Sequence, residues 1–254
     1  MTRLQLQSVA KSFGALEVLR NISLHVAEGE FVSVLGPSGA GKSTIFNLLT
    51  GAEQLSQGRI MFDGAPLAQA RDAFAFMPQR DALMPWRRMI DNATLGLEVQ
   101  GMSRKDARKL AEPLFEEFGL AGFEQAYPAE LSGGMRQRAA LLRTVVQQRK
   151  MLLLDEPFGA LDALTRASMQ HWLESMWQSH RWTALLITHD VREAVYLSDR
   201  IYVLSARPSR IVHEVTVDLP RPRRDSMHKT ALEKAAALEA EILDLLLRAV
   251  PAMT

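Results

Sequence analysis

The sequence predicts an α/β fold with a largely parallel sheet, an N-terminal antiparallel β region and an inserted, all-helical subdomain. Short apolar runs typical of strands alternate with helical stretches along the chain, which is the pattern of such folds. From about residue 91 to residue 146 the strand-like runs disappear, and apolar residues recur at helical spacing instead. The first third of the chain differs from this middle part, with several strand-like runs and a turn signal.

The expected strands follow one another in chain order. They are Leu4–Val9, Ile22–Val26, Phe31–Leu35, Arg59–Phe62, Phe74–Met77, Met151–Leu154, Ala184–Thr188 and Ile201–Leu204. Thr44–Leu49 has the pattern of a helix, Asp63 and Gly64 mark a turn, and Ala206–Arg210 is expected as a turn between two strands.

The middle part predicts helices. The apolar residues Ala107, Leu110, Ala111, Leu114, Phe115 and Phe118 recur at helical spacing. Ser103 is the expected N-cap, and Gly119 the expected stop. Pro113 lacks a backbone donor, so we expect a kink or two shorter helices there.

The C-terminal part is predicted to contain one extended segment and one helix. Leu219–Arg224 is expected to be an extended, basic connection. One apolar face of the final helix is formed by Leu232, Ala235, Leu238, Ile242 and Leu245. Packing of this face on the same domain is the favoured interpretation, and docking of a partner is the alternative.

Composition limits the possible functions. A chain of 254 residues, 47% of them hydrophobic, can bury a full core and is short for several large domains. Its net charge of +1 gives no electrostatic argument for nucleic-acid binding. The absence of cysteine excludes disulfides and thiolate metal sites. The sequence has no apolar stretch typical of a signal peptide or membrane span, so we expect a soluble or peripheral protein.

The most specific motif follows the expected strand Phe31–Leu35 directly. It fits G-x-x-x-x-G-K-[ST] and consists of Gly36, Pro37, Ser38, Gly39, Ala40, Gly41, Lys42 and Ser43, with Thr44 opening the next helix. Glycines let successive N–H groups point inward, and a helix N-terminus adds positive potential. We expect Lys42 to reach the β and γ phosphates of ATP, and the Ser43 hydroxyl to bind Mg²⁺. Kinases, GTPases and motor ATPases also carry such a loop, so the motif alone predicts only nucleotide binding.

A pair of carboxylates narrows the prediction to hydrolysis. The apolar run Met151–Leu154 ends in Asp155 and Glu156, which is typical of a buried strand with two acids at its edge. Burying both acids without partners would cost several kcal/mol, so they should face a cation or water. Asp155 suits the shell of Mg²⁺, and Glu156 suits orienting or deprotonating the attacking water.

The segment Leu131–Arg138 carries a resemblance to a known family. It reads Leu-Ser-Gly-Gly followed by Gln137-Arg138, and the chain resembles the ABC ATPase family from Leu4 to about Val217. Ser132, Gly133 and Gly134 make a second small anion cradle at a helix start. The resemblance implies a P-loop NTPase core. It also implies a dimer in which this signature of one subunit, with Gln137, faces the phosphate loop, Gly36–Ser43, of the other subunit, and two ATP molecules lie between the two subunits.

The resemblance also assigns roles to four further residues. Gln79 matches the glutamine that completes the magnesium and water shell, in a loop that senses the permease. Asp162 matches a loop that crosses the dimer interface. His189 matches the switch histidine, which contacts the γ phosphate and steadies Glu156. Phe13 lies where the family places an aromatic ring, often Tyr, against adenine, and Phe keeps the stacking face while losing the hydroxyl.

A single ABC ATPase domain over residues 1–254 is therefore expected. Its parts are a nucleotide-binding core, a helical signature subdomain and a C-terminal extension with a helix, at residues 1–90 with 147–220, 91–146 and 221–254. The resemblance implies a homodimer bound to an integral membrane permease at the cytoplasmic face of the inner membrane, served indirectly by an extracytoplasmic substrate-binding protein. Nucleic acid is not an expected partner.

One stretch points to a type of importer. Arg80–Ala93, which includes Trp86, and the segments Pro157–Asp162 and 220–224 resemble ATPases of importers for nitrate, sulfonates, taurine, bicarbonate or thiamine precursors. A packed connector is the alternative interpretation of Arg80–Ala93. Two other functions stay open, namely a soluble ABC ATPase of translation or DNA repair and a regulatory module without turnover. The single motif set argues against the first, and the presence of Glu156 and His189 argues against the second.

Overall fold

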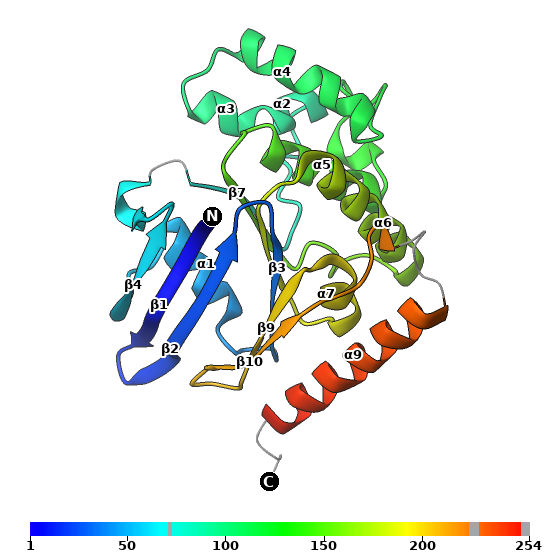
Figure 1. Ribbon diagram of the computed structural model, residues 1–254. Coiled ribbons are helices and arrows are strands. Elements are labelled where there is room, and N and C mark those ends of the chain that lie inside the picture. Colours follow the sequence, from blue (N-terminus) through cyan, green and yellow to red (C-terminus); the bar gives the residue numbers. More distant parts are fainter. Residues whose placement is uncertain (71–72, 224–228, 250–254) are drawn as a thin grey trace. The chain divides into compact units, whose positions relative to one another are not determined.

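The computed structural model describes residues 1–70, 73–223 and 229–249, and the chain forms two compact units (Figure 1). The first comprises Met1–Ala73 and Gln170–Thr254, and the second comprises Phe74–Met169. The boundary between them falls within helix α6 (Ala163–His180). The predicted helical subdomain, residues 91–146, lies within the second unit. In the described part of the chain, no helix has the length and apolar character needed to cross a membrane.

The first unit contains the predicted antiparallel β region. Its strands pair in the order β2-β1-β4-β5, and their bounds are β1 (Thr2–Phe13), β2 (Leu16–Ala27), β4 (Gln57–Phe62) and β5 (Ala65–Pro66). The strands β1 and β2 are longer than predicted and form a hairpin in which Phe13 pairs with Leu16. Leu4, Leu6 and Val9 are buried. Hydrogen bonding between the two strands of the hairpin extends beyond their apolar residues, although the pairing has several register shifts.

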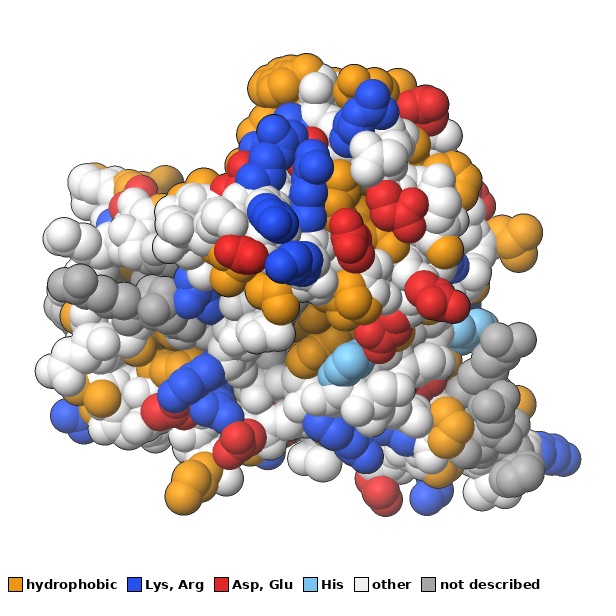
Figure 2. Space-filling model, turned by 90° about the horizontal axis from the view of Figure 1, so that it is seen from above, with side chains coloured by type: hydrophobic (Ala, Val, Ile, Leu, Met, Phe, Trp, Pro, Cys, Tyr) orange, Lys and Arg blue, Asp and Glu red, His pale blue; other side chains and the backbone are white. Residues whose placement is uncertain are grey.

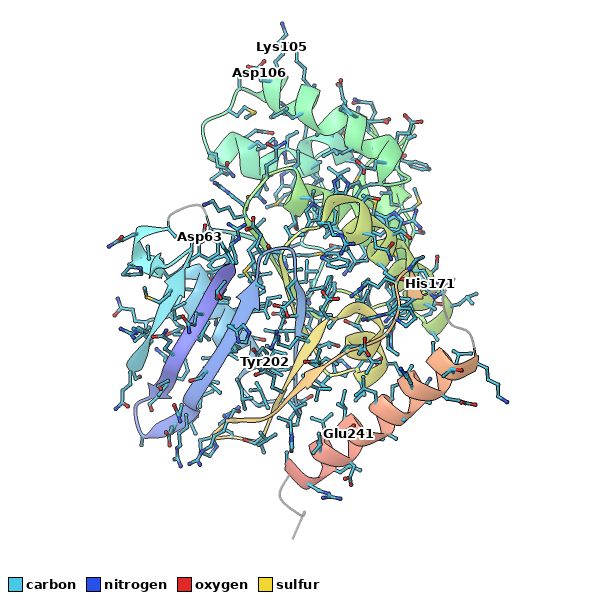
Figure 3. All side chains as sticks on the ribbon, viewed as in Figure 1. Asp63, Lys105, Asp106, His171, Tyr202 and Glu241 are labelled. Atoms are coloured by element: carbon cyan, nitrogen blue, oxygen red, sulfur yellow. The ribbon has the colours of Figure 1, made fainter. Side chains whose placement is uncertain are left out.

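The same unit contains a largely parallel sheet. The strand β3 (Phe31–Leu35) pairs in parallel with both β8 (Ala184–Thr188) and β9 (Arg200–Leu204), and β10 (Ile211–Thr216) pairs with β9 in antiparallel orientation. Every residue of β3 and β8 is buried, as expected for central parallel strands covered on both faces. Tyr202 of β9, labelled in Figure 3, donates a hydrogen bond to the carbonyl oxygen of His25 at 3.2 Å and so links this sheet to β2.

Helices α1 (Lys42–Thr50), α7 (Val191–Leu197) and α9 (Lys229–Ala249) also belong to the first unit. The helix α9 confirms the predicted C-terminal helix, and Ala235 and Ile242 pack into a core with Ala194 and Val195 of α7. The expectation that Leu232 shares this buried face is wrong, because Leu232 is 52% exposed. The buried stripe begins one residue earlier, at Ala231. Arg224, at the end of the predicted connection, lies outside the described residues.

The second unit carries one parallel strand pair and the predicted helices. Strand β6 (Phe74–Met77) pairs with β7 (Met151–Asp155). The helices are α2 (Met89–Ala93), α3 (Leu95–Val99), α4 (Arg104–Glu117) and α5 (Gly133–Val145). The structure confirms Ser103 as N-cap of α4, since its side chain accepts a hydrogen bond from the Asp106 N–H at 3.2 Å.

Helix α4 differs from the prediction at Pro113. We expected a kink or two shorter helices; the helix is continuous through this residue, so the second of these alternatives is wrong. Pro113 lies on the exposed side of α4, where water can hydrate the carbonyl one turn earlier that has lost its donor. Ala107, Ala111 and Phe115 hold the opposite side of the helix in the core.

Candidate functional site

The loop from Gly36 to Gly41 connects β3 to α1 in the first unit. Gly41 is the N-cap of α1 at φ 92°, and a Cβ there would lie 2.7 Å from Val18 Cγ1, so only glycine fits. No side chain caps the first turn of α1. The N–H groups at this helix start are therefore not used by a capping side chain, which suits the binding of an anion.

Lys42 is held inside this loop. Its side chain is buried, and its ammonium donates hydrogen bonds to the carbonyl oxygens of Gly36 at 2.8 Å and Pro37 at 3.0 Å. These contacts hold the ammonium against the carbonyl oxygens at the start of the loop. Ser43 follows in the first turn of α1 and is exposed.

Two residues that sequence reasoning missed support the loop. The Arg207 guanidinium donates to the Gly39 carbonyl oxygen from Nε at 3.0 Å and from an Nη at 2.6 Å. The buried Ser209 hydroxyl donates to the Ala40 carbonyl oxygen. Both belong to the turn predicted over Ala206–Arg210, but the local sequence gives no signal for what that turn touches.

His189 lies at the same sheet edge as the phosphate loop. In the parallel pairing of β3 with β8, Leu35 is opposite Thr188, so Gly36 and His189 each follow the end of an adjacent strand. His189 is exposed, and Asp190 behind it caps α7 by accepting from the N–H groups of Arg192 at 2.9 Å and Glu193 at 3.2 Å. Ligands of parallel α/β sheets bind at this carboxyl edge.

The second unit brings Glu156, one of the two predicted carboxylates, next to Gln79. Met77 of β6 is opposite Leu154 of β7, so the residues that follow each strand share one edge. The Gln79 Nε2 donates a hydrogen bond to Glu156 Oε2 at 3.0 Å. Glu156 has a φ of 43°, a left-handed conformation that costs a non-glycine residue on the order of 1–3 kcal/mol. Such strain at a half-buried carboxylate is typical of a functional position.

The predicted second cradle opens onto a hollow in the same unit. Ser132 is the N-cap of α5 and accepts from the Met135 N–H at 3.3 Å. The hollow has a volume of about 430 Å³ and is lined by Ser132, Gly134, Met135, Arg138, Leu164, Thr165, Ser168 and Met169. A Cβ on Gly134 would lie 3.0 Å from Thr165 Cγ2. The glycine therefore keeps the backbone of the helix start open to a ligand.

Gln137 and Asp162 have structural partners of their own. Gln137 is buried, and its amide donates to the carbonyl oxygen of Pro157, the residue after Glu156. The structure thus places Gln137 inside the unit, where it joins the signature helix α5 to the carboxylate loop. Asp162 is exposed and caps α6 by accepting from the N–H groups of Leu164 at 3.1 Å and Thr165 at 3.0 Å. Hydrogen bonds from Thr165 lower the pKa of the Asp162 carboxyl.

Phe13 ends β1 in the first unit, as a partly exposed ring. It is 43% exposed, and the Lys11 ammonium lies 4.5 Å from its centroid. Lys11 is itself held by Glu53 Oε2 at 2.8 Å, so the cation has a fixed place beside the ring. An aromatic ring in this exposed position can stack on a purine.

A glycine loop that carries a central lysine between a parallel strand and a helix binds the phosphates of a nucleotide. The fold and this loop place the chain among the P-loop nucleotide-binding proteins. Residues 19–159 match the family described as ABC transporter, and the chain belongs to this family.

Similar proteins agree with this assignment. The aliphatic sulfonates import ATP-binding protein SsuB of Pseudomonas putida is 45% identical over 239 residues, which is 94% of this chain and 84% of that protein. The protein of the same name from Yersinia pestis is 44% identical over 243 residues, or 96% of this chain and 85% of that protein.

Solved structures share the fold. The dimeric structure of MJ0796, a bacterial ABC transporter cassette, has a TM-score of 0.72 and 29% identity, and the match covers 84% of this chain and 98% of that one. A structure of the same cassette in a post-hydrolysis state, bound to ADP and Pi, has a TM-score of 0.71 and 28% identity over the same shares of the two chains. These matches confirm the predicted P-loop ATPase fold.

Proposed function

We propose that this ABC transporter ATPase drives an importer of small sulfonates or related anions, working in pairs at the cytoplasmic face of a membrane permease. ATP hydrolysis is the activity of the family, and similar proteins are named as sulfonate import ATP-binding proteins. The observation that carries the catalytic part is the hydrogen bond between Gln79 and Glu156 at the strand edge that also carries Asp155. It holds a carboxylate where a water nucleophile can be oriented.

The phosphate loop supplies the binding energy. We propose that its N–H groups and Lys42 hold the β and γ phosphates, and that the Phe13 ring stacks on adenine. ATP carries about four negative charges, and oriented amides together with a lysine neutralise part of them without moving. His189, which emerges from the strand beside the loop, is proposed to contact the γ phosphate.

The residues assigned to magnesium suit that ion. Ser43, Asp155 and Gln79 offer a hydroxyl, a carboxylate and an amide oxygen, which are the hard donors that Mg²⁺ prefers. Gln79 directs its amide nitrogen at Glu156, so its carbonyl oxygen is the atom left for a metal shell. Among the described residues no cluster of three or more acidic, histidine or cysteine side chains could hold a metal alone. Magnesium fits such a sparse site, because it commonly binds with substrate phosphates and water, and it would supply charge neutralisation there.

The signature cradle is proposed to complete the site of a second copy. Ser132 and Gly134 line an exposed hollow, and a related cassette is described as dimeric. In this arrangement each ATP is bound by the phosphate loop of one subunit and the signature of the other, with Asp162 at the interface between them. ATP then favours the closed dimer, and hydrolysis releases it, because the ligand binds the closed state more tightly.

A permease is the expected partner of the second unit. Trp86 is 74% exposed in the segment that follows Gln79. Figure 2, which looks down on helices α2 to α4, shows Lys and Arg side chains gathered beside apolar ones. Arg87 and Arg88 follow Trp86 directly in the chain, and an exposed aromatic residue beside basic ones is typical of an interaction surface. The substrate-binding protein of an importer of this type acts on the other side of the membrane and is proposed only as an indirect partner.

Replacing one oxygen of Glu156 by nitrogen tests the proposal. In Glu156→Gln we expect the hydrolysis rate to fall on the order of 100- to 10,000-fold, the usual contribution of a general base. Nucleotide affinity should change less than twofold, and ATP should produce a stable dimer. Phosphate release, titration with a fluorescent ATP analogue and light scattering measure the three effects.

The control for this test is Glu241→Gln, since Glu241 is an exposed residue of α9 (Figure 3). It should behave as the parent protein in all three measurements. Parent-level hydrolysis by Glu156→Gln would remove Glu156 from its role. An ATP-loaded Glu156→Gln that stays monomeric at high concentration would contradict the shared site.

A further inference from the structure

The C-terminal segment that follows β10 binds the C-terminal end of helix α7. Arg223 is fully buried, and its guanidinium donates hydrogen bonds to the carbonyl oxygens of Val195 at 2.6 Å, Tyr196 at 2.5 Å and Ser198 at 2.7 Å. These carbonyls lie in the last turn of α7 and at its C-cap, where no intrahelical donor remains. A cation at this position also interacts favourably with the helix dipole.

A second arginine completes this contact, and the two are called the arginine clamp below. Arg221 donates to the carbonyl oxygen of Leu197 at 2.5 Å and to Asp199 Oδ1 at 3.0 Å. Its guanidinium carbon lies 4.3 Å from the centroid of the Trp177 ring. The arginine clamp therefore connects the last turn of α7 to α6 and to the start of β9.

Glu174 of α6 fixes the backbone of the arginine clamp. Its side chain is 2% exposed, and its Oε1 accepts from the Arg223 backbone N–H at 2.8 Å and lies 3.4 Å from an Nη of Arg221. Burial lowers the pKa of Arg223 to about 10, so its guanidinium remains charged at neutral pH. Burying a charge costs several kcal/mol unless its hydrogen bonds are satisfied. A glycine after the C-cap is the common way to end a helix, and it does not require a buried charge.

The other end of α7 carries His189. Only His189 and Asp190 separate the last residue of β8 from the first residue of α7, and Asp190 is the N-cap. Thr188 is buried, and its hydroxyl accepts from the Asp190 N–H at 3.0 Å. Two residues span a short distance, so a shift of α7 moves His189 with it. The helix α9 packs on the flank of α7 through Ala235 and Ile242.

We propose that Arg223, together with Arg221, is a positioning residue for His189. The arginine clamp fixes α7 along its axis, and α7 in turn holds His189 at the carboxyl edge of the sheet. This role rests on the proposed contact of His189 with the γ phosphate. It gives the C-terminal extension, which lies beyond the matched residues 19–159, a part in ATP hydrolysis.

The kinetic test uses the full chain. Arg223→Met keeps the unbranched apolar stem of the side chain and removes its guanidinium group, so kcat for ATP should fall about five- to twentyfold while KM changes less than twofold. Arg223→Lys should restore part of the rate, because an ammonium can still donate to the carbonyls. Arg248→Met is the control, since Arg248 is 76% exposed on α9, and it should match the parent. If Arg223→Met does not fold, Arg221→Met replaces it, with an expected two- to fivefold loss of kcat.

A double variant separates positioning from general destabilisation. In a His189→Ala background, Arg223→Met should lower kcat by less than twofold further, because the positioned group is already gone. A full additional loss would show that the arginine clamp acts elsewhere and would overturn the proposal. Parent-level hydrolysis by His189→Ala would instead refute the proposed function of His189. If His189→Ala is inactive and Arg223→Met is fully active, only the positioning role fails.

Histidine NMR gives a readout independent of activity. The chain has six histidines, and their Cε1–H signals can be followed with ¹³C-labelled histidine. Arg223→Met should move the His189 signal and that of His171, whose ring lies 5.3 Å from the Tyr196 ring. The signals of His25 on β2 and His213 on β10 should stay in place. An unmoved His189 signal in a folded Arg223→Met would overturn the proposal.

Discussion

The phosphate loop, Gly36–Ser43, and the signature loop, Leu131–Gly134, both lead into the start of a helix, but they differ in what they contain. The phosphate loop encloses a buried ammonium, Lys42, and its helix has no capping side chain. The signature loop contains Ser132, the N-cap of α5, whose side chain already accepts a hydrogen bond from an N–H of this helix. Its hollow is wide and open, at about 430 Å³. One loop is built around a fixed charge, and the other presents a polar surface.

This difference predicts separate roles for the two loops in the proposed mechanism. Near the signature, Arg136 pairs with Asp81 Oδ2 at 3.2 Å, and Arg138, which lines the hollow, donates to Met169 Sδ at 3.4 Å. Ser132, Gly133 and Gly134 themselves carry no charge. A hydroxyl and backbone N–H groups bind a phosphate weakly compared with a loop that also supplies a charge. The phosphate loop should therefore determine affinity, and the signature loop should determine whether a bound nucleotide is hydrolysed.

Among changes to the two loops, the largest expected effect is at Lys42. Lys42→Ala should lower ATP affinity roughly 10- to 100-fold, since a hydrogen bond to a charged group contributes about 1.5–3 kcal/mol and 1.4 kcal/mol is tenfold. Titration with a fluorescent ATP analogue measures it. Lys105→Ala is the control, because Lys105 is an exposed residue of α4 in Figure 3 and should leave affinity unchanged. Equal affinity for Lys42→Ala and the parent would show that the phosphate loop does not determine nucleotide affinity.

A methyl group on Gly134 tests the role of the signature loop in hydrolysis. Gly134→Ala should keep the affinity of the single chain for ATP and lower hydrolysis about tenfold, because the methyl enters the hollow proposed to receive a phosphate of the partner's nucleotide. Nucleotide titration and phosphate release separate the two effects. A Cβ here would lie 3.0 Å from Thr165 Cγ2, so displacement of the helix start is a competing cause.

The double variant Gly134→Ala, Thr165→Ser removes that competing cause. Serine lacks the methyl group of threonine and makes room for the new Cβ. Hydrolysis should stay low in the double variant if the methyl obstructs the phosphate. Recovery to the parent rate would show that packing between α5 and α6 was at fault, and the hollow would lose its assigned role.

Much of this comparison was predictable from sequence, because it depends on local order. The buried strands Phe31–Leu35 and Ala184–Thr188 were predicted with correct bounds, since continuous apolar runs mark central parallel strands. The family resemblance assigned Gln79 and Glu156 to one site, and the pairing of β6 with β7 places the residues that follow these two strands at one edge. Family resemblance then attached roles to these positions.

What the sequence did not predict depends on contacts between distant segments. The pattern around Arg207 and Arg223 is that of an exposed basic turn and a basic connection, yet Arg207 binds the phosphate loop and Arg223 is fully buried. Local composition cannot show that a helix end far away in sequence needs donors. Gln137 is similar, because its polar character gives no sign of the buried hydrogen bond to Pro157. At Pro113 the sequence predicted an interruption that the structure does not have, because an exposed position in a helix can accommodate a proline.

The smallest expected effect on hydrolysis is that of Ser132→Ala, and Ser103→Ala serves as the matched control. Ser132 and Ser103 are both N-cap serines that accept an N–H, for α5 and α4 respectively. Loss of an N-cap costs about 1 kcal/mol, so Ser132→Ala and Ser103→Ala should each lower the Tm by about 2–4 °C.

Only Ser132→Ala should also reduce hydrolysis, by several-fold, because only its hydroxyl faces the hollow assigned to a partner's nucleotide. Thermal unfolding and phosphate release on the two variants compare the effects directly. A difference in hydrolysis at equal stability would assign the Ser132 hydroxyl a role in the ATP site beyond capping its helix. Equal hydrolysis by the two variants would mean that the serine serves only the helix, and that the backbone N–H groups at Gly133 and Gly134 provide whatever the signature contributes.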